Sequence, residues 1–155
     1  MDINTLFGLE GKTALVTGGA TGIGRMAAEA LVRAGATVLI ASRKGDACEA
    51  VAKELNAMGA SGKAIGFAGD VGTEEGVDAM VEAVKARTDR LDILMNHAGI
   101  TWGAPLADFP STARAPLTTV HVAGPLPLPP TLPPTLTHPP PPAPPARPLP
   151  LAPPP

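Results

Sequence analysis

Proline is confined to one end of this chain, and that distribution limits how much of the chain can fold. All 20 prolines lie at or beyond Pro105, and 17 of the 31 residues from Pro125 to Pro155 are proline. Proline lacks an amide donor and clashes with a preceding helical turn, so such a run supplies neither strands nor helices to a core. We therefore expect a folded unit over residues 1–115 and a disordered, proline-rich tail of low complexity over residues 116–155.

Short apolar runs alternate with segments of helical period between residues 12 and 99. The first run is nearly continuous in aliphatic character, which is typical of a strand buried on both faces of a parallel sheet. The four runs cover residues 13–17, 37–41, 64–68 and 91–96. Strands that alternate with helices form βαβ units with right-handed crossovers. The sequence predicts an α/β fold, a Rossmann-like doubly wound parallel sheet truncated to about four strands in the order 3-2-1-4.

The predicted helices have apolar faces and recognisable ends. In the first, apolar residues recur at spacings of three and four, at Ile23, Ala27, Ala30, Leu31 and Ala34. Asp46 and Glu49 resemble a capping box for the second, whose apolar face comprises Cys48, Val51, Ala52 and Leu55. Thr73 caps the third, whose apolar face comprises Val77, Met80, Val81 and Val84. Gly35 and Gly59 end the first two helices.

The pattern decays beyond Gly99. A short helix is expected over residues 113–122, limited by Pro116, with Leu117, Val120 and Ala123 on one side. Trp102, the one tryptophan, is expected to pack over the loop after the fourth strand.

Charge and cysteine content exclude several classes of protein. The formal charge is -2, from 14 acidic and 12 basic residues, and no basic block exists to bind a nucleic acid. The single cysteine, Cys48, cannot form an internal disulfide. The first residues have neither a basic nor an apolar signal region, and no long apolar run follows. We expect a soluble cytoplasmic protein that has no membrane partner.

A glycine-rich turn lies between the first strand and the first helix. It reads Thr17-Gly18-Gly19-Ala20-Thr21-Gly22-Ile23-Gly24. Glycines allow a sharp turn and a close approach of the backbone to a pyrophosphate, while the helix start offers it free amides and a positive dipole. The turn therefore predicts a dinucleotide site, although a purely structural glycine turn is the alternative.

With its T-G-x-x-x-G-x-G spacing, this sequence resembles the short-chain dehydrogenase/reductase family. Asp70-Val71 matches the pair that holds the adenine in that family, and Asn96-His97-Ala98-Gly99 matches the N-N-A-G signature with one substitution. The resemblance covers residues 8 to about 124 and is greatest to reductases of the 3-oxoacyl-carrier-protein type. It implies hydride transfer between a nicotinamide dinucleotide and a small carbonyl or alcohol. The cofactor-binding residues it implies are Gly18, Thr21, Gly22, Ile23, Gly24, Ser42, Arg43, Asp70, Val71, Asn96, Ala98 and Gly99.

Several of these residues also have plainer interpretations. Asp70 could be a turn former or a helix N-terminal charge, and Asn96 and Gly99 could form an ordinary turn at a strand end. His97 stands where the family has its second asparagine, which weakens a backbone hydrogen-bonding role. No His or Cys is spaced to make it a metal ligand, so no metal site is expected.

The residues after the second strand favour NADP over NAD. An NAD site places a carboxylate there to accept the ribose 2'-hydroxyl, and this carboxylate would repel a 2'-phosphate. Here the residues are Ser42-Arg43-Lys44. Arginine can pair with a phosphate through two hydrogen bonds and serine adds a hydroxyl. The alternative is that Arg43 and Lys44 are a solvated start to the next helix.

The catalytic residues that the resemblance implies are missing. A reductase of this family protonates its alkoxide product with a tyrosine, assisted by a lysine four residues later and a serine. This chain has no tyrosine, and its last lysine is Lys85. Val120-His121-Val122-Ala123-Gly124 matches the family's V-N-V-x-G stretch with histidine in place of asparagine, and we interpret His121 as structural. No residue is predicted to be catalytic, and the interface elements of the family oligomer would lie in the missing half.

Three functional interpretations remain open. The first is an NADP-binding module of the oxidoreductase family that is inactive by itself. The second is a nonfunctional truncated or frame-shifted product, because Asn-to-His, Thr-to-Pro and Gln-to-Pro changes can each arise from an A-to-C change. The least favoured is an adaptor whose tail, at Arg147-Pro148-Leu149-Pro150-Leu151-Ala152-Pro153, docks onto Src-homology 3 or similar domains.

Overall fold

The computed structural model describes residues 6–101, 112 and 114–123. Within these residues, parallel strands form a single sheet in the order β3-β2-β1-β4. The strands are β1 (Thr13–Thr17), β2 (Thr37–Ser42), β3 (Lys63–Ala68) and β4 (Ile93–Asn96). The predicted α/β class and strand order are confirmed. Trp102 and the proline-rich residues 124–155 lie outside the described residues, so the predictions for them stay predictions.

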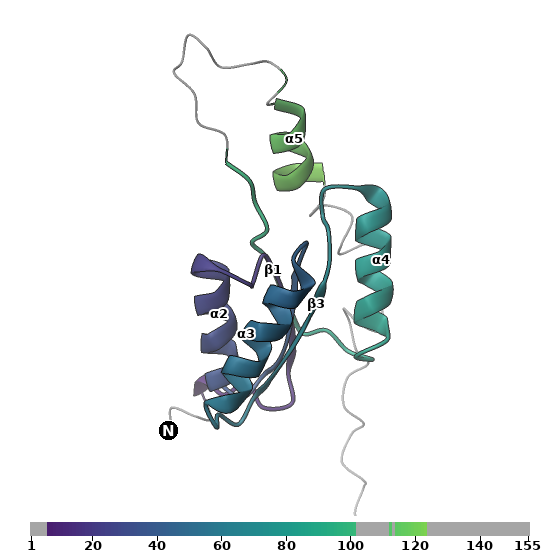
Figure 1. Ribbon diagram of the computed structural model, residues 1–155. Coiled ribbons are helices and arrows are strands. Elements are labelled where there is room, and N and C mark those ends of the chain that lie inside the picture. Colours follow the sequence, from purple (N-terminus) through teal and green to yellow (C-terminus); the bar gives the residue numbers. More distant parts are fainter. Residues whose placement is uncertain (1–5, 102–111, 113, 124–155) are drawn as a thin grey trace, which may run out of the picture.

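Three helices cover the two faces of the sheet (Figure 1). Helices α2 (Gly22–Arg33) and α3 (Gly45–Ala57) pack on one face, and α4 (Glu74–Lys85) packs on the other. Successive strand residues point to opposite faces of the sheet, and each face has its own apolar core. Val16 and Ile40 face α2 and α3, while Leu15 and Leu39 face α4. All four side chains are fully buried, which explains why these strands are continuously apolar.

The predicted apolar face of α2 is wrong by one position. The helix buries Gly24, Ala28 and Val32, whereas Ile23 is 67% exposed. The cause is Gly24, because a Cβ atom at this residue would lie 2.3 Å from the carbonyl oxygen of Gly18. This close backbone approach fixes the rotation of α2, so that residues 24, 28 and 32 face the sheet.

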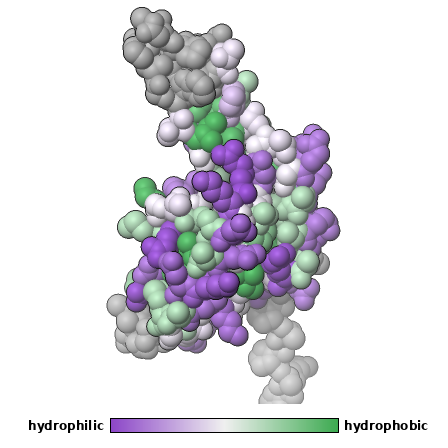
Figure 2. Space-filling model, viewed as in Figure 1, coloured by the Kyte–Doolittle hydropathy of each residue, from purple (hydrophilic) through white to green (hydrophobic). Residues whose placement is uncertain are grey.

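The apolar faces predicted for α3 and α4 are confirmed. The buried residues are Cys48, Val51, Ala52 and Leu55 in α3, and Val77, Met80, Val81 and Val84 in α4. The opposite side of α3 is polar, and the surface over it is mainly hydrophilic (Figure 2). Thr73 caps α4 as predicted, because its side chain accepts a hydrogen bond from the amide of Gly76.

The predicted capping box of α3 is wrong. The helix begins at Gly45, so Asp46 lies inside its first turn, and the N-cap residue, Lys44, makes no side-chain capping bond. Gly45 packs closely on β3, since a Cβ atom there would lie 3.1 Å from the Cβ atom of Ala68. From the first turn, the Asp46 carboxylate still interacts favourably with the positive end of the helix dipole.

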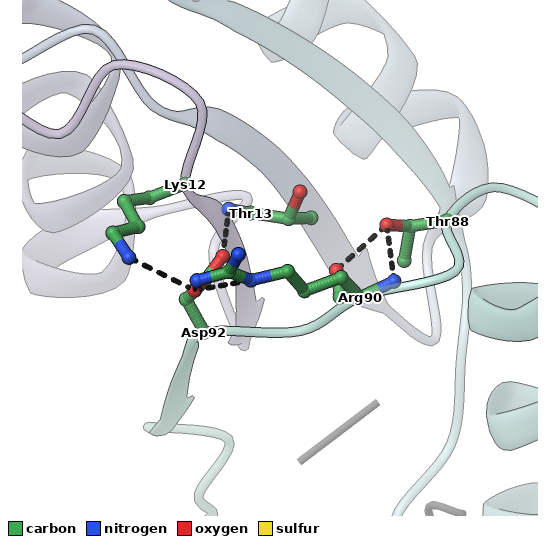
Figure 3. Close-up of polar contacts among 5 residues, drawn as sticks. All are labelled: Lys12, Thr13, Thr88, Arg90 and Asp92. Carbon is green, nitrogen blue, oxygen red and sulfur yellow. Dashed lines mark hydrogen bonds and ion pairs between the residues drawn. The ribbon is translucent and has the colours of Figure 1, made fainter. Parts of the chain in front are cut away.

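A polar cluster fixes the start of β4, which begins two residues later than predicted (Figure 3). The Asp92 carboxylate accepts a hydrogen bond from the Thr13 amide at 2.9 Å and pairs with Lys12 at 3.3 Å and with Arg90. Burial would raise the pKa of Asp92, but the Thr13 amide and the Arg90 and Lys12 side chains outweigh it and lower this pKa below its usual value. The cluster therefore ties β4 to β1 at the amino end of the sheet.

The last described segment is helical despite its proline. Helix α5 (Arg114–Thr118) is followed by a π-helical turn, η3 (Thr119–Ala123). Pro116 lies in the first turn of α5, where its missing amide has no intrahelical partner to lose. On the side of this segment that was expected to be apolar, Val120 packs against the core beneath α4, while Ala123 is exposed. No helix within the described residues is long and apolar enough to cross a membrane.

Candidate functional site

A cleft of about 1270 Å³ opens at the carboxyl ends of the strands. Loops that follow all four strands form its walls, and residues of α5 and η3 form its far side. Ten of the twelve predicted cofactor-binding residues line it: Gly18, Thr21, Gly22, Ile23, Ser42, Arg43, Asp70, Val71, Ala98 and Gly99. The structure therefore brings together residues that are up to 81 positions apart in the sequence.

Gly24 and Asn96 are not in the cleft wall. Gly24 is buried beneath it, where it sets the contact between α2 and the turn after β1. Asn96 is the last residue of β4 and its side chain is exposed. The neighbouring residue, His97, lines the cleft instead.

The glycine turn after β1 requires its glycines for two different reasons. Gly18 has a φ of 71°, and a Cβ atom there would lie 2.8 Å from the Cα atom of Ala98 in the loop after β4. Gly22 has a φ of 54°, but a Cβ atom there would meet nothing within 4 Å. Gly18 therefore packs two loops together, whereas Gly22 presents an open backbone surface to the cleft.

The amino end of α2 is left free for a ligand. Its N-cap residue, Thr21, makes no side-chain capping bond, and no acidic residue lies in the first turn. By contrast, α4 has a capping side chain and two acidic residues, Glu74 and Glu75, in its first turn. The unpaired amides and positive dipole end of α2 are thus directed to a cleft that suits an anion.

Thr17 joins the loops after β1 and β4. Its hydroxyl accepts hydrogen bonds from the amides of His97 and Ala98, at 3.0 and 3.1 Å, and lies 3.4 Å from the carbonyl oxygen of Met95. It is the one buried polar residue among those that the structure describes. The sequence motif includes Thr17, but this bridging role depends on a contact across about 80 residues and was not predicted.

The end of β2 provides cations and a hydroxyl. Arg43 and Lys44 are exposed and line the cleft together with Ser42. The Ser42 hydroxyl accepts a hydrogen bond from the Lys44 amide at 3.2 Å and lies 3.1 Å from the Sγ atom of Cys48. This corner of the cleft therefore carries positive charge and no carboxylate of its own.

Asp70 has the turn-forming role that was one of its two interpretations. Its Oδ1 atom accepts a hydrogen bond from the Gly72 amide at 2.8 Å, which is an Asx turn. The residue also lines the cleft beside Val71, so the turn and a ligand contact are compatible.

The far wall was not predicted from the sequence. It comprises Ala115, Pro116, Thr119 and Val120. The Nε2 atom of His121 lies 2.7 Å from the carbonyl oxygen and 3.2 Å from the amide nitrogen of Ile100, which holds this wall against the loop after β4. The V-H-V-A-G stretch was the only signal in this region, and it indicated a structural role without a partner.

The cleft fits a nicotinamide dinucleotide but offers no metal site. Free helix amides, an open glycine backbone and a basic corner lie in one cavity, as a diphosphate with a further phosphate would require. Within the part of the chain that the structure describes, no three His, Cys, Asp or Glu residues lie close enough together to hold a metal ion.

Comparisons with known proteins agree with this geometry. The model of the short chain dehydrogenase family matches residues 12–135. The rhamnolipids biosynthesis 3-oxoacyl-[acyl-carrier-protein] reductase of Pseudomonas aeruginosa is 42% identical over 104 residues, which are 67% of this chain and 40% of that protein. A 3-oxoacyl-[acyl-carrier-protein] reductase of Aquifex aeolicus is 44% identical over 94 residues, covering 60% of this chain and 37% of that protein.

Solved structures give the same result. The RhlG/NADP active-site complex of Pseudomonas aeruginosa superposes with a TM-score of 0.74 at 38% identity, covering 81% of this chain and 48% of that one. A 3-oxoacyl (acyl-carrier-protein) reductase of Agrobacterium tumefaciens C58 with NADP bound has a TM-score of 0.76 at 30% identity, covering 88% of this chain and 52% of that one. The chain thus spans about half the length of the structures that it matches, or less than half in the case of the curated relatives.

Proposed function

Because this chain belongs to the short-chain dehydrogenase family, we propose that it binds NADP(H) in the cleft at the carboxyl end of its sheet. We further propose that these 155 residues do not reduce a carbonyl substrate by themselves. The observation that carries the first part is the uncapped amino end of α2, which opens into the same cleft as Arg43 and Lys44. The solved structures from Pseudomonas aeruginosa and Agrobacterium tumefaciens described above hold NADP, which supports the choice of ligand.

The residues of the cleft have separate roles in this proposal. The turn from Gly18 to Ile23 and the first amides of α2 would hold the pyrophosphate. Ser42 and Arg43 would bind the 2'-phosphate, where a carboxylate would reject it. Asp70 and Val71 would contact the adenine. Ala98 and Gly99 would contact the adjoining ribose, with Asn96 supporting their loop from the end of β4.

Proton transfer is the step that these residues cannot perform. The cofactor, when bound, supplies a hydride to the carbonyl carbon of a small ketone or 3-oxoacyl substrate. The alkoxide then requires a proton from a nearby acid, and the sequence contains no tyrosine to donate one. His121 is not proposed as a substitute, because it does not line the cleft and its ring is engaged by the backbone of Ile100. Reduction would need residues beyond those of this sequence.

The division of the chain at residue 115 is retained as part of the proposal. Residues 116–123 lie beside the cleft and contribute Pro116, Thr119 and Val120 to its wall. The prolines from Pro125 onward have no part in the proposed binding. The carbonyl substrate and any oligomer belong to whole proteins of the family and are not assigned to these residues.

A fluorescence titration of the purified full chain with NADPH tests the proposal. We expect saturable binding, weaker binding of NADH, and at least a fivefold loss of NADPH affinity in Arg43→Ala, since a charge-assisted hydrogen bond contributes about 1.5–3 kcal/mol. Lys53→Ala is the matched control, because Lys53 is exposed on α3 outside the cleft wall. A folded chain that binds no NADPH would support the nonfunctional-product alternative.

The second part of the proposal needs an activity measurement. The same protein is mixed with NADPH and a 3-oxoacyl thioester, and the nucleotide absorbance is followed over time. We expect no consumption above that of the buffer. Steady turnover would overturn the view that these residues lack a proton donor.

A further inference from the structure

His97 lies in the cleft wall, at a position where the N-N-A-G signature of the family has an asparagine. Its ring packs on the first turn of α2, because the Cδ2 atom lies 2.8 Å from where a Cβ atom of Gly24 would be. That turn is the one whose free amides face the cleft. The imidazole is therefore next to the place where an anion would bind.

The position of His97 is fixed from a rigid part of the fold. Its amide donates to the Thr17 hydroxyl at 3.0 Å, and the amide of Ala98 donates to the same oxygen at 3.1 Å. Thr17 is the last residue of β1, in the centre of the sheet, and is 2% exposed. With its backbone held in this way and its ring packed against Gly24, His97 loses little entropy when it contacts a bound ligand.

The ring nitrogens of His97 are free for a ligand. Among the residues that the structure describes, none forms a hydrogen bond with either nitrogen, although the residue is half-buried in the cleft wall. No buried side-chain nitrogen among the described residues lacks a partner, so these unpaired ring nitrogens are accessible to water or to a ligand.

The charges around the cleft decide which ligand this would be. The charged residues in its described wall, besides His97, are Arg43, Lys44 and Asp70. His121 does not line the cleft and its ring is bonded to Ile100, and the first turn of α2 has no acidic residue. The wall therefore carries two cations and a positive helix end against one carboxylate, which is already engaged in a turn, so it suits an anionic ligand such as a diphosphate.

We propose that His97, as the protonated imidazolium, donates a ring N–H to a phosphate oxygen of the bound dinucleotide, so that binding to the neutral form takes up a proton from solution and binding tightens as the pH falls. This inference rests on the proposed function, since it assumes NADP in the cleft. Histidine is the side chain that ordinarily changes charge between pH 5 and 8, so the effect should fall in that interval. An asparagine at this position would bind without such a pH dependence.

Calorimetric titration of the full chain with NADP⁺ and with NAD⁺ at pH 6 and pH 8 tests the proposal. NAD⁺ is included because it lacks the 2'-phosphate, whose own ionisation affects NADP⁺ binding in this range. We expect the affinity for each nucleotide to be about 5- to 10-fold higher at pH 6 in the wild type than in His97→Phe, and nearly equal at pH 8. Phenylalanine provides an aromatic ring to pack on Gly24 but has no ring nitrogen. If the His97→Phe protein does not fold, His97→Asn serves as the second variant.

A readout of the ring itself separates this inference from the proposed function. The proton spectrum of the His97 Cε1–H, assigned from the His97→Asn variant, is followed against pH with and without saturating NADP⁺. We expect its titration midpoint to move to higher pH when the nucleotide binds. Binding that leaves the midpoint and the pH dependence unchanged would overturn the role of His97 alone, whereas absence of any binding would overturn both proposals.

Discussion

One nitrogen of His121 faces both backbone groups of Ile100. The Nε2 atom lies 2.7 Å from the carbonyl oxygen and 3.2 Å from the amide nitrogen. An imidazole nitrogen either donates or accepts, depending on the tautomer, so only one of these hydrogen bonds exists at a time. One of the two backbone groups of Ile100 therefore always lacks a hydrogen bond from His121, although this contact holds η3 to the loop after β4.

His121→Asn should stabilise the protein. An asparagine side chain has an amide donor and a carbonyl acceptor side by side, so it can pair with both groups of Ile100. We expect the free energy of unfolding to rise by about 0.5–1.5 kcal/mol, measured from the urea midpoint. His121→Ala, which removes both contacts, should lower it by a similar amount. An unchanged midpoint in both variants would mean that the contact contributes nothing to stability.

Of the glycine-to-alanine substitutions in the glycine turn, Gly24→Ala should destabilise the protein most. The new Cβ atom would lie 2.3 Å from the carbonyl oxygen of Gly18, and backbone atoms cannot move aside as a flexible side chain can. We expect a loss of at least about 2 kcal/mol in the free energy of unfolding, together with loss of NADPH binding.

Ala30→Gly is the matched control for that substitution. Ala30 lies on the exposed side of the same helix, so this change should cost only the intrinsic helix preference of about 1 kcal/mol and leave NADPH binding intact. A stable Gly24→Ala protein that binds NADPH would show that the turn can relax around the added methyl group.

The sequence predicted the strands better than the orientation of the first helix. A run as short and as rich in aliphatic residues as 37–41 favours a strand buried on both faces, and β2 occupies Thr37–Ser42. In α2, alanines and leucine fall on several sides, so periodicity alone allows more than one buried face. The backbone contact between Gly24 and Gly18 decides among them, and it exists only in the folded protein.

The residues of the candidate site likewise divide into those that local sequence patterns predict and those that depend on long-range contacts. Glycine and strand-end signals predicted the wall formed by the loops after β1 to β4, because each loop follows its own strand in the sequence. Thr119 and Val120 in the far wall depend on the long-range contact between His121 and Ile100. The bridging hydroxyl of Thr17 likewise spans about 80 residues. Local patterns contain no information on such pairings.

Asp92 makes stability depend on pH at the amino end of the sheet. Its pKa is lowered in the folded protein: burial opposes the shift, but the Thr13 amide, Arg90 and Lys12 outweigh it. A lowered carboxyl pKa stabilises the folded state above the unfolded value of about 3.9, and this contribution is lost as the pH falls through the folded value. Asp92→Asn should therefore reduce the free energy of unfolding by about 1 kcal/mol at pH 7.

The difference between wild type and Asp92→Asn should shrink as the pH is lowered from 5 to 3, as measured by urea unfolding at each pH. Asp89→Asn serves as the control, because Asp89 is exposed and forms no ion pair among the described residues. It should leave the midpoint unchanged throughout. A constant difference between wild type and Asp92→Asn down to pH 3 would mean that the carboxylate charge is unimportant to the cluster.

Arg43→Asp should invert the choice between the two dinucleotides. The residue lines the cleft directly after β2, and the described wall there contains no carboxylate. An aspartate would accept the ribose 2'-hydroxyl of NAD(H) and repel the 2'-phosphate of NADP(H). We expect NADPH affinity to fall by at least about tenfold and NADH affinity to be kept or raised. Lys53→Asp makes the same charge change on the exposed side of α3 and should affect neither nucleotide. Equal losses for NADPH and NADH in Arg43→Asp would show instead that Arg43 contributes general positive potential rather than recognition of the 2'-phosphate.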